Sequence, residues 1–238
     1  MLSERIAWIK NEFSKEGMSI DSEIAEKLLR YYDLLIDTNR VMNLTAITEF
    51  DEVVRKHFAD SLVLSKYVDF HNIHRVIDIG TGAGFPGLVL KIVFPDISLT
   101  LLDSLAKRIR FLQNVSEELG LNDIEFVHAR TEDAAALSKY RENYDLAVSR
   151  AVAQLRVLSE YCLPYVKKNG LFVAYKGGDV SEELEASQKA FKLLGGSLEN
   201  VETFPLYDMQ RSLVFIRKSS DTPKKYPRQA GMPAKKPL

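Results

Sequence analysis

A glycine-dense stretch, VIDIGTGAGFPG, follows a short run of β-branched residues near position 80. Gly82, Gly84 and Gly87 fit G-x-G-x-x-G, the pattern of a strand-to-helix turn that approaches the pyrophosphate of a dinucleotide. The same stretch also fits D-x-G-x-G-x-G, starting at Asp78 and Gly80, which is typical of turns that hold S-adenosylmethionine. Both ligands need glycine because the backbone must pass close to them. The two patterns predict different enzymes.

The acidic residue before the glycines distinguishes the two ligands. A pyrophosphate is anionic and binds the N–H groups of a helix N-terminus, so a carboxylate beside it is unfavourable. S-adenosylmethionine carries a sulfonium cation and an ammonium group, and Asp78 at the end of the strand favours such a ligand. Pro86 stands where a dinucleotide-binding helix would present its N–H groups, and proline has none to donate. The stretch therefore favours the methyl donor.

Polar residues at the ends of the next two predicted strands fit the adenosine part of either ligand. Asp103 ends LTLLD, where a carboxylate can accept hydrogen bonds from both ribose hydroxyls. Thr131 and Glu132 follow the third strand in ARTED, where we expect the adenine edge. Each position also has a structural alternative, because both can cap or begin the next helix. Together they predict an adenosine-binding edge of the sheet.

The fourth predicted strand ends in AVSRA and lacks the Asn/Asp-Pro-Pro-aromatic loop by which many methyltransferases orient an exocyclic amine. Arg150 supplies a cation there without an evident base. We expect Cys162, in mid-helix, to be a buried apolar residue. His71 and His74 lack matched partners, so we expect no metal site. Transfer to a ring nitrogen with a free lone pair, such as guanine N7, needs in-line placement more than proton removal.

The pattern divides the chain into three parts. Residues 1–70 have helical periodicity, interrupted near NRVMNLTAIT, which predicts an N-terminal helical extension. Residues 71–218 alternate strands with helices and finish in two strands, which predicts an α/β domain with a mainly parallel sheet and an antiparallel edge. Residues 219–238 are rich in Pro and Lys, so we expect a flexible basic tail; an arm that contacts phosphates is the alternative.

Composition limits the possible partners. The 238 residues carry a formal net charge of −1, so a nucleic acid would have to be met by a local basic patch. Two basic runs on predicted helices comprise Arg55, Lys56, His57, Lys107, Arg108 and Arg110. No apolar run approaches the ~20 residues of a membrane span, and the amino terminus lacks the apolar core of a signal peptide. We therefore expect a cytoplasmic protein without a membrane partner, and the lone cysteine fits that compartment.

The motifs VIDIGTGAGFPG, LLDSLAKRIRFL, SRA and YKG, preceded by NLT and RKHFADS, resemble the glucose-inhibited division protein B family, also called ribosomal RNA small-subunit methyltransferase G. The resemblance runs over residues 20–217. It implies a class I (Rossmann-like) S-adenosylmethionine-dependent methyltransferase sheet with an N-terminal helical extension. It also implies methylation of guanine N7 in bacterial 16S ribosomal RNA, with S-adenosyl-L-methionine as cofactor and this RNA or the small ribosomal subunit as partner.

The resemblance also implies roles for individual residues. The implied donor site comprises Gly80, Phe85, Asp103, Thr131, Glu132 and Arg150, and the glycine pattern adds Asp78, Gly82 and Gly84. The residues implied to face RNA or the target base are Asn43, Arg55, His57, Asp60, Ser61 and Lys176. We take Arg150 and Lys176 as the candidate catalytic residues. Lys107 and Arg108 would extend a phosphate-binding strip.

Two other functions stay open at this point. A nicotinamide-dependent oxidoreductase would use the G-x-G-x-x-G pattern, although the chain leaves little room after residue 75 for a second domain with a proton donor. A non-catalytic RNA-binding or ribosome-assembly factor would keep the sheet as a scaffold, although it would not need Asp78 and Asp103. The patterns also leave open whether the RNA is naked, in an assembly intermediate or in a mature subunit.

Overall fold

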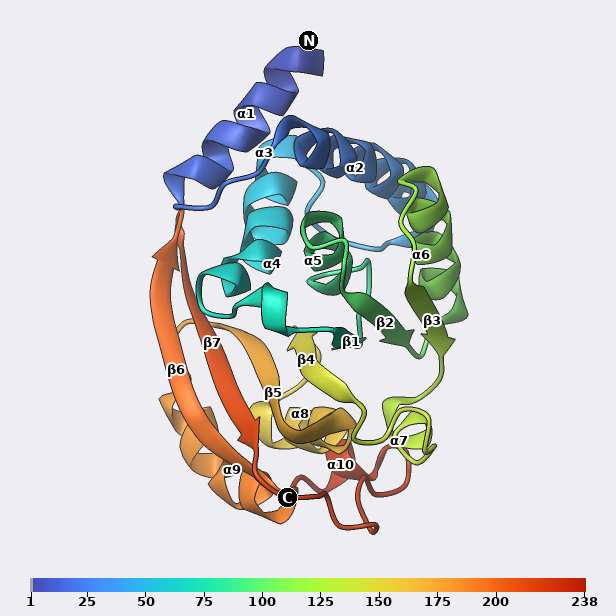
Figure 1. Ribbon diagram of the computed structural model, residues 1–238, viewed down its shortest axis with the longest axis vertical. Helices are drawn as coiled ribbons and strands as arrows, with labels where there is room; N and C mark the ends of the chain where they lie inside the picture. Colours follow the sequence, from blue (N-terminus) through green and yellow to red (C-terminus); the bar gives the residue numbers. More distant parts are fainter. Residues whose placement is uncertain (1) are drawn as a thin grey trace.

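The computed structural model, which describes residues 2–238, contains a seven-stranded sheet with helices on both faces (Figure 1). The strand order is β3-β2-β1-β4-β5-β7-β6. The strands are β1 Arg75–Ile79, β2 Ser98–Asp103, β3 Ile124–His128, β4 Tyr144–Arg150, β5 Val166–Gly177, β6 Gly196–Leu206 and β7 Met209–Lys218. Neighbouring strands from β3 to β5 pair parallel, while β7 is antiparallel to both β5 and β6. This is the mainly parallel sheet with an antiparallel edge that the sequence pattern predicts.

Helices alternate with the parallel strands, as the βαβ pattern requires. They are α5 Gly87–Val93, α6 Ala106–Glu118, α7 Thr131–Ala134, α8 Leu155–Cys162 and α9 Ser181–Leu193. α5 and α6 cover one face of the sheet, and α8 and α9 cover the other (Figure 1). α8 ends at Cys162, two residues before Pro164. Pro164 lies in the short 3-10 helix Leu163–Tyr165 (η4), and β5 begins directly after it because proline cannot continue an α-helix.

The N-terminal extension lies on the α5 and α6 face of the sheet (Figure 1). Its elements are α1 Leu2–Lys15, α2 Ser22–Met42, α3 Phe50–Val53, the π-helix η1 Val54–Ala59, α4 Asp60–Leu62, and the 3-10 helices η2 Val63–Lys66 and η3 Phe70–Asn72. The Asp21 carboxylate accepts a hydrogen bond from the N–H of Ile24 and so caps α2. Asn43 ends α2 in the left-handed conformation, with φ 47°, which starts the connector to α3.

Apolar burial holds the extension against the sheet. Phe13, Leu28, Leu35 and Phe58 are fully buried and belong to the same core as the apolar side chains of α5 and α6. Burying one such side chain stabilises a fold by roughly 1.5–3 kcal/mol. The extension is therefore an integral layer of the molecule, and it brings the RKHFADS segment to the carboxyl end of β4.

Residues 219–238 pack against α7 and α8, which differs from the flexible basic tail expected from their composition (Figure 1). Thr222 and Tyr226 are buried, and the segment ends in the short helix α10, Met232–Lys235. Arg228 forms an ion pair with Glu160 of α8, whose side chain is fully buried. Composition alone indicated a solvated tail because it does not reveal that a buried carboxylate elsewhere in the chain is the partner of one of its cations.

Within residues 2–238, no helix combines the length and apolar character needed to cross a membrane. The same residues contain no group of three or more His, Cys, Asp or Glu side chains placed to hold a metal ion. Cys162 is buried in the core on the α8 side of the sheet, as expected for a small apolar residue in mid-helix.

Candidate active site

A cavity of about 380 Å³ lies at the carboxyl ends of β1, β2 and β3, the edge where open α/β sheets bind ligands. Gly80 follows β1, Asp103 ends β2, and Thr131 and Glu132 follow β3. All four line the cavity. Its volume falls in the range of small-molecule sites, ~300–1,000 Å³. The structure thus brings together four of the residues that the sequence predicts for the donor.

Gly80 lets the backbone form one wall of this cavity. Its φ is +69°, and a Cβ atom placed on it would lie 2.6 Å from Cγ2 of Val152, in the loop after β4. The N–H groups of Gly80 and Thr81 donate to the carbonyl of Leu102, which ties the turn to β2. A side chain at position 80 would collide with Val152 and strain the backbone. Glycine at position 80 therefore lets the Val152 side chain pack against the main chain of this wall.

Asp78 lies behind the turn and does not line the cavity. Its carboxylate is fully buried, and Oδ2 accepts hydrogen bonds from the Gly87 N–H at 2.9 Å and the Thr81 hydroxyl at 2.8 Å. Oδ1 has no hydrogen-bond partner. Burial raises the pKa of this carboxyl to about 6. Asp78 thus holds the glycine turn in shape, and its charge acts on the cavity only through the intervening backbone.

Gly82 and Gly84 shape the same turn without lining the cavity. The N–H of Gly82 donates to the Asp103 carboxylate at 3.0 Å. Gly84 has a φ of +100°, and a Cβ atom there would meet the Tyr31 hydroxyl of the extension and, at 2.8 Å, Cδ2 of Leu112. The two glycines therefore serve the packing of the turn between β2 and the extension.

Asp103 is held at the tip of β2 by three donors. Its carboxylate accepts from the N–H groups of Gly82 and Leu105, at 3.0 and 2.9 Å, and from the Arg108 guanidinium at 3.2 Å. The Leu105 contact lies in the turn before α6. The N-cap of this helix is Leu105, without a side-chain cap, so Asp103 is not the helix cap named as its structural alternative. A carboxylate offers about four lone-pair sites, so it can also accept from a ligand hydroxyl. Arg108 lines the cavity beside it, away from any basic strip on the outer surface.

The Thr131–Glu132 turn closes the far end of the cavity. The Thr131 hydroxyl donates to the carbonyl of Tyr161 at 3.2 Å, and the Tyr165 hydroxyl donates to the carbonyl of Thr131 at 2.6 Å. Glu132 is 5% exposed, and its Oε1 accepts from the N–H of Gly231 at 2.8 Å. The turn is thus fixed by α8 on one side and by the C-terminal segment on the other.

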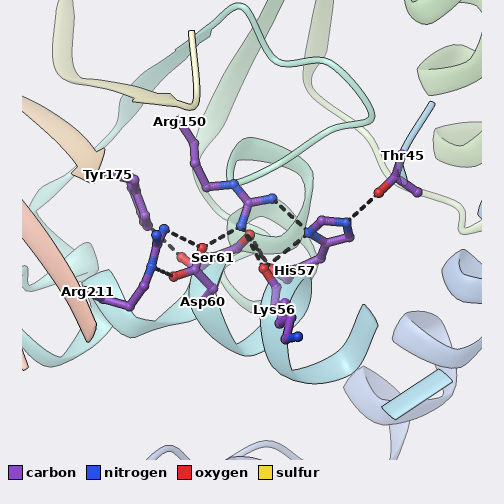
Figure 2. A network of polar contacts seen from close by, with 8 residues as sticks. All are labelled: Thr45, Lys56, His57, Asp60, Ser61, Arg150, Tyr175 and Arg211. Carbon is purple, nitrogen blue, oxygen red and sulfur yellow. Dashed lines mark hydrogen bonds and ion pairs between the residues drawn. The ribbon is translucent and has the colours of Figure 1, made fainter. Parts of the chain in front are cut away.

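Arg150, at the end of β4, reaches into the extension (Figure 2). Its Nη1 donates to Oδ2 of Asp60 at 2.7 Å. Arg211 of β7 binds the same carboxylate through Nε and Nη2, at 2.6 and 2.9 Å. The hydroxyl of Tyr175 donates to the carbonyl of the neighbouring Ser61 at 2.8 Å. We call the three charged side chains, Asp60, Arg150 and Arg211, the Asp60 cluster.

His57 and Phe85 stack beside the Asp60 cluster. Their ring centroids are 4.6 Å apart with an interplanar angle of 22°, and the Arg150 guanidinium lies 5.1 Å from the centroid of Phe85. The His57 Nε2 atom is 2.8 Å from the Thr45 hydroxyl (Figure 2). Burial and the charge of Arg150 lower the pKa of His57 to about 4, so the ring is neutral at pH 7. Phe85 is 6% exposed and does not line the cavity.

Lys176, the second candidate catalytic residue, holds the loop that follows β4. Its Nζ donates to the carbonyl of Ala153 at 3.0 Å and forms an ion pair with Glu183 at 2.7 Å. Glu183 also accepts from the N–H of Leu155 at the start of α8. Val152, which faces Gly80, lies in this loop. Lys176 therefore supports a wall of the cavity from outside.

The residues predicted to face RNA do not form one continuous strip. Arg55 forms an ion pair at 2.8 Å with Glu12, whose side chain is 1% exposed. Asn43 is the C-cap of α2. The Lys107 ammonium donates to the carbonyl of Met42 at 3.4 Å, next to that cap. Asp60 and Ser61 are buried, so neither presents a side chain to an RNA surface.

Sequence reasoning missed Arg211, Val152, Tyr161 and Ala234. Arg211 completes the Asp60 cluster from a strand 151 residues further along the chain. Val152, Tyr161 and Ala234 line the cavity and come from the loop after β4, from α8 and from α10. No local motif marks them, since each enters the site through the folding of a distant segment. The single available signal was the position of Val152 directly after SRA.

Comparison with solved structures supports the same architecture. The chain is similar to the YcgJ protein from Bacillus subtilis, with a TM-score of 0.53 and 14% identity, covering 69% of this chain and 100% of that one. It is also similar to P. horikoshii TYW2, solved in complex with MeSAdo, with a TM-score of 0.54 and 12% identity, covering 68% of this chain and 62% of that one. At such identities the likeness concerns the fold, which is the class I S-adenosylmethionine-dependent methyltransferase fold.

Sequence comparison is more specific. The family model "GidB: rRNA small subunit methyltransferase G" matches residues 24–214. The protein named ribosomal RNA small subunit methyltransferase G in Lachnoclostridium phytofermentans is 50% identical, over 93% of both chains. The protein of the same name in Bacillus subtilis is 48% identical, over 94% of this chain and 95% of its own. The chain therefore belongs to the rRNA small subunit methyltransferase G family.

Proposed function

We propose that this chain transfers the methyl group of S-adenosylmethionine to N7 of a guanine in 16S ribosomal RNA. The observation that carries the proposal is the cavity at the strand tips, where the open backbone at Gly80, the Asp103 carboxylate and the Thr131–Glu132 turn meet. Family membership names the substrate class, and the sheet edge supplies a site of suitable size and polarity. We place most of the donor-binding residues in residues 71–218.

The residues around the cavity fit S-adenosylmethionine. The main chain at Gly80 lines the cavity where we place the methionine part, and Asp103 offers a carboxylate to the two ribose hydroxyls. Glu132 lies where the exocyclic amine of adenine needs an acceptor. When bound, the donor supplies a methyl group on a positively charged sulfur. Asp103 and Glu132 would meet the adenosine part of a dinucleotide equally well, so the choice of the methyl donor rests on membership of the methyltransferase family.

The acceptor side needs no general base. Guanine N7 already carries a lone pair, so the chain has to align the base and does not have to remove a proton. A guanidinium can donate a hydrogen bond to O6 of guanine and leave the N7 lone pair free for the methyl group, and we assign base orientation to Arg150. Asp60 holds this guanidinium at 2.7 Å, and the neutral ring of His57 packs against Phe85 beneath it. Lys176 acts indirectly by supporting the loop that carries Val152.

The partner follows from the proposed substrate. We infer that the chain works in the cytoplasm on 16S ribosomal RNA, presented naked, in an assembly intermediate or in the small ribosomal subunit. Exposed cations outside the Asp60 cluster, Lys107 and Arg110 among them, would contact phosphates. Neither a membrane nor a metal ion enters the proposal.

The test is transfer of a tritiated methyl group to small subunits from cells that lack this protein. We expect label in 16S RNA and, after nuclease digestion and mass mapping, on N7 of guanine. The Asp103→Ala variant should bind S-adenosylhomocysteine at least about tenfold more weakly, because it loses a hydrogen-bonded charged group. Asp133→Ala, an exposed neighbour of Glu132, serves as control. Absence of label would contradict the proposal, as would binding of NADH in place of S-adenosylhomocysteine.

A further inference from the structure

The C-terminal segment reaches the donor cavity from outside the sheet. It leaves β7 at Lys218 and runs beside α7 and α8, on the face opposite the N-terminal extension (Figure 1). Ala234 of α10, four residues before the end of the chain, lines the cavity together with Asp103 and Glu132. A segment that composition marks as solvent-exposed therefore supplies part of the proposed ligand site.

Directed polar contacts dock the first half of the segment. The Arg141 guanidinium donates to the carbonyls of Thr222 and Tyr226, at 2.6 and 2.9 Å. Arg228 donates to the Glu160 carboxylate through its backbone N–H at 2.8 Å and through its guanidinium Nε at 2.9 Å. Glu160 is fully buried, and a buried charge without its partner is strongly destabilising. This half is therefore anchored to the fold independently of any ligand.

The second half contacts the cavity wall itself. The backbone N–H of Gly231 donates to Oε1 of Glu132 at 2.8 Å, and Pro233 is buried. Tyr161, next to the anchored Glu160, forms the neighbouring wall. These contacts use the main chain and apolar atoms of the segment. Its lysines, Lys235 and Lys236, are exposed, so the cations of the segment do not make the contact.

We propose that residues 231–234, which we call the C-terminal strap, form the adenosine-side wall of the donor cavity and position Glu132 for the donor. This inference rests on the proposed function, since it names the strap as part of the site for S-adenosylmethionine. Loss of the strap opens the cavity at α10 and releases the Glu132 side chain. The strap is therefore needed for donor affinity, whereas Lys235 and Lys236, which follow it, are not.

Calorimetric titration with S-adenosylhomocysteine tests the strap on the full chain and on a chain that ends at Ala230. The shortened chain keeps Tyr226 and the Arg228–Glu160 pair, so its melting temperature should stay near that of the full chain. We expect its Kd for S-adenosylhomocysteine to rise about tenfold, because one hydrogen bond to a charged group and one cavity wall are lost. The double variant Lys235→Ala/Lys236→Ala should bind like the full chain.

A second pair of variants keeps every contact of the strap. Ala234→Trp places a large side chain at the cavity and should raise the Kd several-fold, whereas Ala230→Trp, an exposed control, should not. If the shortened chain does not fold, these two variants still test whether the strap forms a wall of the donor cavity. If Ala234→Trp, or a shortened chain that folds, binds S-adenosylhomocysteine with unchanged affinity, the proposed role of the strap is wrong and the proposed function is unaffected. A second result would also contradict the strap: Lys235→Ala/Lys236→Ala binds RNA more weakly, while the shortened chain binds S-adenosylhomocysteine as the full chain does. The segment would then be an arm that contacts RNA. A full chain that binds no S-adenosylhomocysteine overturns the proposed function and the strap with it.

Discussion

The donor cavity and the Asp60 cluster are built from the same residue types and differ in what their polar groups face. In the cavity, backbone atoms at Gly80 and the carboxylates of Asp103 and Glu132 line the wall. These two residues are 2% and 5% exposed, and each carboxylate accepts at least one hydrogen bond within the protein. In the Asp60 cluster, one carboxylate that is 2% exposed accepts hydrogen bonds from two guanidinium groups, Arg150 and Arg211. The first region borders a cavity, whereas the charged groups of the second bind one another within the protein.

Several arginines near the cavity and the Asp60 cluster are already paired with carboxylates of the protein. Arg55, Arg108 and Arg150 are all paired with internal carboxylates, those of Glu12, Asp103 and Asp60. A paired guanidinium still has donors for a nucleobase, but its net charge is offset locally. We therefore expect attraction to the RNA backbone to come from exposed lysines and arginines outside these pairs.

The largest expected effect is a loss of stability on breaking the Asp60 cluster. Replacing Asp60 with Ala leaves the guanidinium groups of Arg150 and Arg211 without their shared carboxylate, 10% and 17% exposed. We expect the free energy of unfolding, measured by urea denaturation, to fall by roughly 3–5 kcal/mol, the cost of breaking a buried charge pair by removing one partner. Asp51→Ala is the control. Asp51 forms an exposed pair with Arg55 at 3.9 Å, and its loss should change stability by less than about 1 kcal/mol. If Asp60→Ala and Asp51→Ala both lowered the free energy of unfolding by the same small amount, the Asp60 cluster would not be a buried charge cluster that stabilises the fold.

A smaller effect concerns pH and the neutral state of His57. Burial and Arg150 lower its pKa from 6.5 to about 4 in the folded protein, while Asp60 opposes this. The unfolded chain therefore binds more protons than the folded one between about pH 6.5 and 4, and stability is lost as pH falls through that window. From pH 7.5 to pH 5 we expect His57 to cost the fold about 2 kcal/mol.

His57→Gln should abolish this loss while keeping a hydrogen bond to Thr45. The measurement is urea denaturation of wild type and variant at pH 7.5 and pH 5, compared as a double difference. The pKa of Asp78 is raised by burial to about 6, which works in the opposite direction but is common to both proteins and cancels. His71→Gln, at an exposed position, serves as control. An identical pH response of wild type and His57→Gln would refute the neutral, buried ring.

The smallest expected effect compares two neighbours on α6. Lys107 is exposed, whereas Arg108 is turned to the cavity and bound to Asp103. Lys107→Ala should weaken binding to 16S RNA about threefold and reduce the slope of log affinity against log salt by about 0.7–0.9. Arg108→Ala should leave both unchanged and alter the Kd for S-adenosylhomocysteine instead. If both variants reduced the slope of log affinity against log salt equally, Arg108 would contact RNA phosphates as Lys107 does.

Local patterns predicted the parts of the site that lie on consecutive elements. Asp103, Thr131 and Glu132 each follow a strand, and the carboxyl ends of parallel strands meet at one edge, so their meeting in the cavity follows from the order of elements. The choice of donor over dinucleotide rested on the presence of Asp78. The structure keeps that residue behind the turn, where it accepts from Gly87 and Thr81.

Other parts depend on segments that are distant in sequence. The Asp60 cluster joins η1 and α4, β4 and β7, and the strap joins the last residues of the chain to α7 and α8. A basic residue in a sequence does not show which carboxylate it will meet. For this reason Arg108 was expected on the outer surface and residues 219–238 were expected in solvent, although both lie against the body of the protein.

By itself, the sequence determined the fold class, the antiparallel edge and the ligand class of the glycine turn, because periodicity and turn chemistry act between residues close in the chain. Only the tertiary structure decided which charges are neutralised and which face a ligand. Ion pairs form between whichever groups the packed elements bring within a few ångströms, and Asp60 and Arg211 are joined by packing alone. The wall at Ala234 has the same origin, since Ala234 lies far in sequence from Asp103, Glu132 and Tyr161, which line the cavity with it.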